Sequence, residues 1–143
     1  MVKKTALIAL SALLYHACAH ISYALAIRPA GVVIVWFPAG VTLAALALLN
    51  RGSWPFALAG AVIGNVTADV LNGTSFPMSV VGGLTNALES LVAASVLVWL
   101  TRSPVALTRV RDVAALVIGS AGISNALTAL VGAGAAASGA HRT

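Results

Sequence analysis

The sequence predicts an all-α protein, a polytopic bundle of about five transmembrane helices whose N-terminus lies in the cytoplasm. The first observation is composition: 60% of the 143 residues are hydrophobic and 8% are charged, against about 25% charged in a typical soluble domain. So few polar side chains cannot cover a water-exposed surface, which excludes an ordinary soluble enzyme and a disordered tail. The single cysteine, Cys18, excludes a disulfide scaffold.

The second observation is a series of apolar segments close to the length of a membrane span. About 20 mainly apolar residues are needed to cross roughly 30 Å of hydrocarbon, and the segments lack the alternation of barrel strands. The predicted spans are residues 5–27, 33–49, 54–71, 76–100 and 113–136. Turn-forming or polar residues separate them at 28–31, 50–53, 72–75 and 101–112. The second and third segments are short, so their ends are open and one of them can be re-entrant.

The distribution of basic residues predicts the orientation. With the N-terminus inside, six of the eight Lys and Arg side chains lie on the cytoplasmic side, as the positive-inside rule requires. This asymmetry accounts for the net charge of +5 and leaves too few basic residues for a phosphate-binding face. We therefore expect the lipid bilayer, and no nucleic acid, as a partner. The inner set is Lys3, Lys4, Arg51, Arg102, Arg109 and Arg111; the outer set is Arg28 and Arg142.

The N-terminus has a second interpretation. Two lysines precede an apolar run that reaches Ala17-Cys18-Ala19, a pattern similar to a cleavable signal peptide. Because the apolar sequence continues to Ile27, a retained first span is favoured. A lipid anchor at Cys18 is less favoured still, since Tyr15 and His16 occupy positions that require small or apolar residues.

Polar side chains occur at membrane depth in four of the five predicted spans. A charge inside a bilayer costs on the order of 3 kcal/mol or more. Glu89, near the middle of the fourth span, is therefore expected to be protonated, hydrated or paired, with protonated His16 or His20 as the internal partner. The asparagines are expected mainly to hydrogen-bond between helices. The residues at this depth are His16, His20, Asn65, Asn86, Glu89 and Asn125.

Neither Asp69 nor the histidine pair is expected to bind a metal ion. Asp69 lies one turn closer to the outer surface than Asn65, where water can solvate it. His16 and His20 can face one ion, but two ligands from one helix are too few for a zinc site, and Cys18 points to another face. We therefore expect no metal and no cofactor. The sequence also shows no catalytic triad, phosphate loop or CxxC motif, so we expect no enzymatic activity.

Small residues and a proline mark two candidate packing positions. Gly60 and Gly64 form a GxxxG pattern in the third predicted span, which permits close helix approach. In the second predicted span, Pro38 removes a backbone hydrogen-bond donor and Gly40 allows another helix to approach closely. Backbone carbonyls near Trp36 can then face a cavity. The alternative is an interfacial tryptophan with proline in the first helical turn, which needs no ligand.

The order and spacing of several motifs resemble the MASE-type membrane-associated sensor domain, a bacterial multi-span module that precedes histidine kinase, GGDEF or EAL output domains. The resemblance covers roughly residues 15–136 and implies a sensory input module in the bacterial inner membrane, as in two-component systems. It also favours the cavity interpretation at Trp36. The motifs are Val35-Trp36-Phe37-Pro38-Ala39-Gly40-Val41, Asn50-Arg51-Gly52 with Trp54-Pro55, Gly60-Ala61-Val62-Ile63-Gly64-Asn65, Gly83-Leu84-Thr85-Asn86-Ala87-Leu88-Glu89 and Arg109-Val110-Arg111-Asp112-Val113.

Two departures from that family are visible. Phe37 stands where the family usually has the first of two prolines. The family domain also has additional spans before its output domain, so we expect this chain to be the N-terminal part of a longer protein, truncated at its C-terminus. Five spans would in addition leave residues 137–143 outside the cell.

The expected function is detection of a small ligand, a membrane partner or a bilayer change, passed to a cytoplasmic output domain. A membrane-protein partner or homodimer is expected. One alternative is a small transporter or permease fragment with a midplane substrate site; another is an assembly partner packing through Gly60 and Gly64. The sensing candidates are Trp36, Pro38, Gly40, Asn65, Asn86, Glu89, His16 and His20.

Overall fold

The computed structural model describes residues 2–27 and 33–101, with isolated positions at 113, 114, 117, 122, 126, 129 and 130. Its elements are α1 (Val2–Ala24), α2 (Phe37–Leu48), the 3-10 helix η1 (Arg51–Ser53), α3 (Trp54–Leu71) and α4 (Phe76–Thr101). Three helices, α1, α3 and α4, are long and apolar enough to cross a membrane. The predicted all-α membrane fold class is confirmed. The fifth predicted span, 113–136 with Asn125, lies outside the continuously described residues.

The helix α2 is shorter than the span predicted at 33–49. Its 12 residues rise about 18 Å, against about 30 Å of hydrocarbon. A proline is accepted only in the first turn of a helix, because it lacks an N–H and its ring clashes with the preceding turn. Pro38 therefore sets the start of α2 at Phe37, with Trp36 as the N-cap residue. The prediction that residues 33–36 are helical was wrong.

The reversal between α3 and α4 depends on residues at the end of α3. The side chain of Asn72 donates from Nδ2 to the carbonyl oxygen of Ala68 at 2.8 Å, and the backbone N–H of Asn72 donates to the same oxygen at 3.1 Å, so this last-turn carbonyl is fully satisfied. Gly73 then adopts φ +90°, a conformation that other residues rarely reach. The chain can thus turn within residues 72–75, where the sequence placed a turn.

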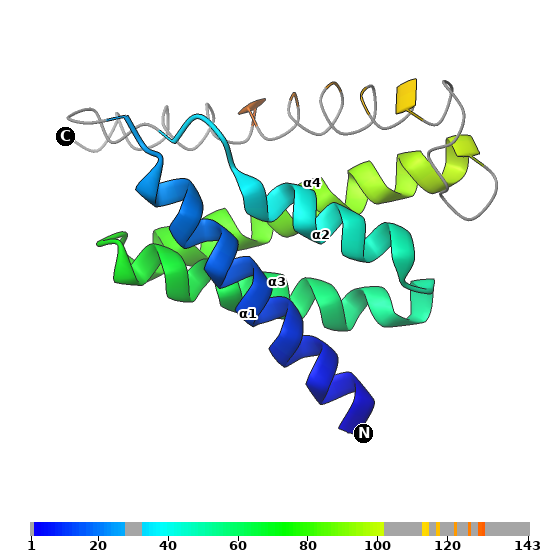
Figure 1. The fold of residues 1–143 in the computed structure, drawn as a ribbon, viewed down its shortest axis with the longest axis horizontal. Coiled ribbons are helices and arrows are strands. Elements are labelled where there is room, and N and C mark those ends of the chain that lie inside the picture. The colour runs from blue at the N-terminus through cyan, green and yellow to red at the C-terminus, as the bar shows by residue number, and fades with distance from the viewer. Residues whose placement is uncertain are drawn as a thin grey trace.

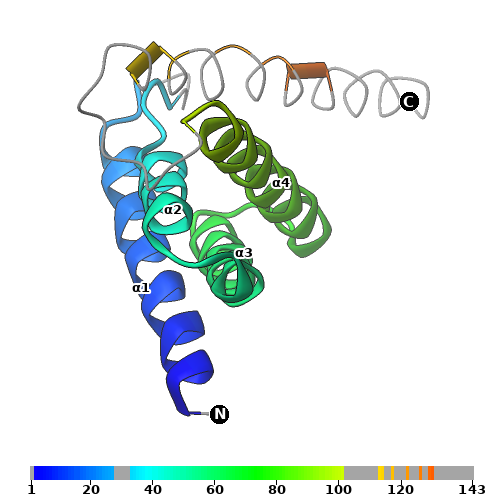
Figure 2. The same cartoon turned by 90° about the vertical axis from the view of Figure 1, so that its right-hand side faces the viewer.

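The four helices run in alternating directions. In Figure 1, α1 and α3 run one way while α2 and α4 run the other, and α1 crosses α3 obliquely. Figure 2 shows α2 and α3 between α1 and α4. The contacts agree with this arrangement, since α1 packs mainly on α3, and α4 packs on α3 and α2.

The crossing of α1 over α3 is close enough to require glycine. A Cβ atom added at Gly60 would lie 2.4 Å from the carbonyl oxygen of Ile8, and one added at Gly64 would lie 2.6 Å from that of Ala12. The GxxxG pattern therefore lies at the α1–α3 contact. Among the described residues, nothing lies within 4 Å of a Cβ added at Gly40, so the close approach expected there is not found in this part of the chain.

The core is divided between the two ends of the bundle. Near the end of α1 and the start of α2, two tyrosines and Trp36 pack with small alanines of α1 and α3. Near the end of α2 and the start of α3, Leu46, Trp54, Ala57 and Ala94 form an apolar cluster. The tyrosine hydroxyls and the Trp36 indole N–H therefore lie in the cluster near the end of α1 and the start of α2.

We expect Gly60→Ala to lower the free energy of unfolding by about 1–3 kcal/mol, as overpacking does, because the obstructing atom belongs to the backbone of Ile8. Gly82→Ala in α4 is the matched control: its Cβ would make an ordinary 3.6 Å contact with Asp69. Alanine for glycine in a helix should there gain up to about 1 kcal/mol. Unfolding in mixed micelles of rising SDS content measures both variants, and equal stability would contradict the α1–α3 contact.

Candidate functional site

Six side chains from α1, α3, α4 and the residue before α2 form one hydrogen-bonded group, here named the polar cluster. Its members are far apart in the sequence, so the cluster exists only when these parts of the bundle pack together. They lie toward the end of the bundle where α1 and α3 end and α2 and α4 begin (Figure 1). The cluster comprises Tyr15, Tyr23, Trp36, Asn65, Asp69 and Asn86.

The Tyr15 hydroxyl is the centre of the polar cluster. It donates to Oδ1 of Asn65 at 2.7 Å, and it accepts from Nε1 of Trp36 at 3.3 Å and from Nδ2 of Asn86 at 3.1 Å. A hydroxyl has one donor and two acceptor sites, so all three are used. Tyr15 is 3% exposed, and its hydroxyl links α1 to α3, to α4 and to the N-cap of α2.

Asn65 is equally saturated. Its Oδ1 also accepts from Nδ2 of Asn86 at 2.8 Å, and its Nδ2 donates to Oδ2 of Asp69 at 2.7 Å and to the carbonyl oxygen of Ser79 at 3.5 Å. A carboxylate can only accept, so the Asp69 contact fixes which way the Asn65 amide points. Asn65 is 1% exposed; its four hydrogen bonds remove the cost of burying it.

Asp69 belongs to the polar cluster. Besides the hydrogen bond from the Asn65 amide, it accepts one at Oδ1 from the Tyr23 hydroxyl, with an oxygen–oxygen distance of 2.5 Å. The side chain is half-buried, and each of its oxygens has a donor from α1 or α3. The expectation that Asp69 is simply solvated was therefore wrong, because its partners come from residues 46 positions away and from the previous turn of its own helix.

Trp36 is packed rather than free at an interface. Its ring meets the rings of Tyr15 and Tyr23 edge to face, with centroids 6.4 Å and 5.5 Å away, an arrangement that adds about 0.5–1.5 kcal/mol per pair. One residue later, the backbone N–H of Phe37 donates to Oγ of the buried Ser22 at 3.0 Å. The start of α2 is thus attached to α1 by both a side chain and the backbone.

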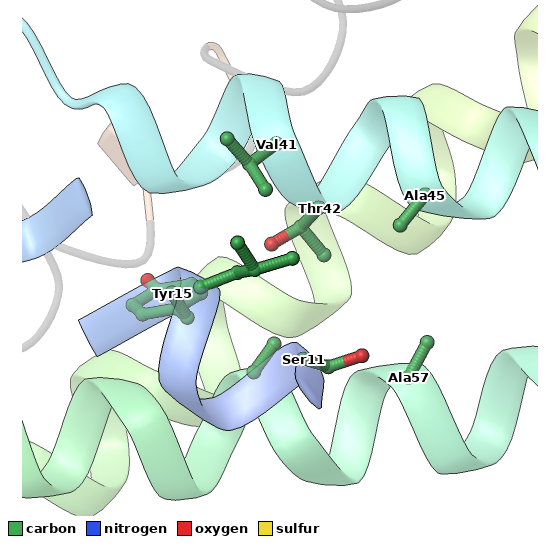
Figure 3. Close-up of a pocket in the computed structure, with 8 residues that line it drawn as sticks. Ser11, Tyr15, Val41, Thr42, Ala45 and Ala57 are labelled. Atoms are coloured by element: carbon green, nitrogen blue, oxygen red, sulfur yellow. The ribbon is translucent and has the colours of Figure 1, made fainter. Parts of the chain in front are cut away.

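A small cavity adjoins the polar cluster between α1, α2 and α3 (Figure 3). Its volume is about 30 Å³, enough for one or two waters and too small for a sugar or a nucleotide. The hydroxyl of Thr42 in its wall donates to the carbonyl oxygen of Pro38 at 2.8 Å. The labelled lining residues are Ser11, Tyr15, Val41, Thr42, Ala45 and Ala57.

The remaining sequence-derived candidates are divided over other places. Glu89 is half-buried on α4, one turn after Asn86. His16 and His20 hydrogen-bond each other, and His16 contacts Thr67 of α3, so pairing of either ring with Glu89 stays a prediction. Pro38 is buried in α2, while Gly40 is exposed.

Asn65 lies closer to the end of α3 than to its start. Asn65 lies six residues before the end of α3 at Leu71, which corresponds to about 9 Å along the helix axis. The third segment matches its predicted bounds, and the midplane position expected for Asn65 stays a prediction. Tyr23, Trp36 and Asp69 all lie near helix ends and draw the cluster toward that side.

Sequence reasoning missed the tyrosines and Ser22 as members of this region. Tyrosine is common in membrane helices near the interface, so neither tyrosine attracts notice alone. A signal was nevertheless present: Tyr15, Ala19, Ser22 and Tyr23 follow the i, i+4, i+7, i+8 spacing of one helix face. This is the face of α1 that carries the cluster contacts.

We expect Tyr15→Phe to lower the free energy of unfolding by about 1–2 kcal/mol, because it leaves Trp36, Asn65 and Asn86 each with one bond fewer. Thr85→Val in α4 is the control, since the Thr85 hydroxyl donates at 2.8 Å to Val81 of its own helix. SDS-induced unfolding of the two variants makes the comparison. If Tyr15→Phe lowers the free energy of unfolding no more than Thr85→Val does, the central role of the Tyr15 hydroxyl in the cluster is contradicted.

Comparison with known protein families identifies the family of this chain. A family model described as MASE1 matches residues 6–139, which include every member of the polar cluster. Neither a curated protein nor a solved structure matches the chain. Because the family model covers most of its length, the chain belongs to the MASE1 family of membrane-associated sensory domains.

Proposed function

We propose that the chain is the sensory input module of a bacterial signal-transduction protein in the inner membrane, and that the polar cluster is the element its stimulus acts on. One observation carries this proposal: a single hydroxyl, that of Tyr15, bonds to α3, to α4 and to the N-cap of α2. A movement of any one of these elements therefore changes the bonds of the others.

Saturation of the cluster gives it the properties of a switch. Tyr15 and Asn65 have no spare hydrogen-bonding site, so another helix packing must break several of these bonds together. Two discrete packings then compete, and a stimulus shifts their ratio by its difference in affinity for them. The same saturation disfavours a transporter, whose substrate needs polar groups that are free to bind it.

The size of the adjoining cavity limits the kinds of stimulus that can act on the cluster. A volume of about 30 Å³ leaves no room for a metabolite in this cavity. A membrane partner, a change in the bilayer, or a ligand bound at the cluster end of the bundle fits the arrangement better. In each case the shift in helix packing passes to a cytoplasmic output domain.

Asn86→Ala tests this in the native protein that carries these residues, with the activity of its output pathway as the readout. The variant removes two bonds between helices, together about 1–2 kcal/mol, and should change the ratio of the two packings, and so the output, by about 5–30-fold. Glu89→Gln, one turn later, asks whether the carboxylate shares this role.

Thr85→Ala is the matched control for this experiment, because it removes a polar side chain from the neighbouring position without touching the cluster. Its output should equal that of the unmodified protein. Membrane insertion of each variant is measured by fractionation. Normal insertion of Asn86→Ala with unchanged output would overturn the role of the polar cluster in signalling.

A further inference from the structure

We propose that His16 and His20 form a two-ligand site for a divalent transition-metal ion of the zinc and copper class. The two rings stand on successive turns of α1 with their Nε2 atoms 3.0 Å apart. The Nδ1 atom of His16 lies 3.0 Å from Oγ1 of Thr67 on α3. The site is separate from the polar cluster, and its function as a metal site goes beyond the proposed sensing role of that cluster.

The hydrogen bonds of Thr67 set the proton positions on His16. The Thr67 hydroxyl lies 2.9 Å from the carbonyl oxygen of Ile63 and 3.0 Å from that of Gly64. Both carbonyl oxygens can only accept a hydrogen bond. Its proton is therefore directed to its own helix, so Oγ1 accepts a proton from Nδ1 of His16. A neutral His16 then has its lone pair on Nε2, the tautomer that binds a metal.

The distance between the two Nε2 atoms suits a shared ion. Imidazole nitrogen binds zinc at about 2.0–2.1 Å, so two such ligands at a tetrahedral angle are about 3.3 Å apart. The observed 3.0 Å needs to open by only a few tenths of an ångström. To bind, His20 moves its proton from Nε2 to Nδ1 by exchange with water, with no net proton released.

Thr67 supplies the support that metal-binding histidines usually have. A histidine ligand typically donates its second N–H to an oxygen that fixes its orientation. Here the oxygen comes from α3, so the position of the ligand on α1 depends on the contact between the two helices. This arrangement could not be inferred from the i, i+4 spacing alone.

Access and stoichiometry favour an exchangeable ion. His20 is not covered by neighbouring parts of the protein and lies four residues before the end of α1 at Ala24, about 6 Å along the axis, so an ion would enter from that end of the helix and not through the lipid. Within the part of the chain that the structure describes, no group of three His, Cys, Asp or Glu side chains surrounds such a site, so water would fill its remaining positions. The inference revises the expectation, made from spacing alone, that the pair binds no metal.

The full chain, purified in lipid nanodiscs without a polyhistidine tag, is titrated with Cu²⁺ and with Zn²⁺. We expect one ion to bind per chain. The electron paramagnetic resonance spectrum of bound Cu²⁺ should show nitrogen hyperfine splitting from two imidazoles. Copper should bind more tightly than zinc, and Mg²⁺ should not compete. His20→Ala, at an exposed position, and His16→Ala should each weaken binding by about tenfold or more.

Two further variants separate this site from adventitious binding. Thr67→Val should weaken binding about tenfold, because it removes the acceptor that orients His16, and Thr67→Ser should restore it. His141→Ala, which removes the third histidine of the chain, should have no effect. Binding that survives both His16→Ala and His20→Ala, or that is lost in His141→Ala, would overturn the proposal, as would several weak ions per chain.

Discussion

The hydrogen bond between the Tyr15 hydroxyl and the Asn65 amide organises the described bundle. It joins the two helices with the closest crossing, and each partner passes the connection on: Tyr15 to Trp36, Asn65 to Asp69, and both to Asn86. In a hydrocarbon environment, packing and interhelical hydrogen bonds replace the hydrophobic effect as the forces that hold helices together. A network of this kind can therefore specify which helix faces meet.

The two glycines of α3 make that bond geometrically attainable. Gly60 and Gly64 bring the α3 backbone against α1, and Asn65 follows directly in the sequence. Its short amide can then reach Tyr15 across the crossing. Without the glycines, the helices would stand farther apart and Asn65 would lose its partner on α1, Tyr15. Packing at Gly64 and hydrogen bonding at Asn65 thus depend on one interhelical distance.

Much of the fold followed from hydropathy, because the length of apolar segments is set by the bilayer. The bounds of α3 and the turn after it could be inferred from residues 72–75. Trp36, Asn65 and Asn86 stood out as polar groups in apolar segments, and the structure brings these three together. The partners could not be inferred. Tyr15 is unremarkable by composition, and the role of Asp69 depends on Tyr23, which reaches it only in the folded bundle.

The start of α2 and the arrangement of the histidine pair could not be inferred from the sequence either, and each depends on a local physical cause. The start of α2 depends on a single residue, Pro38, whose effect on the helix end outweighs the apolar character of residues 33–36. The properties of the histidine pair depend on ring orientation and on the hydroxyl of Thr67. Spacing along one helix determines which side chains are neighbours, and says nothing of which nitrogen carries the proton.

The length of α2 has a consequence for the surrounding lipid. An apolar helix of 12 residues presents about 18 Å to a hydrocarbon layer of about 30 Å. Acyl chains beside it must compress, or its ends must be shielded by neighbouring helices, and the cost grows with the thickness of the layer. Since the start of α2 is attached to Ser22 and carries Trp36, the balance of forces on the Tyr15 network depends on how thick the host membrane is.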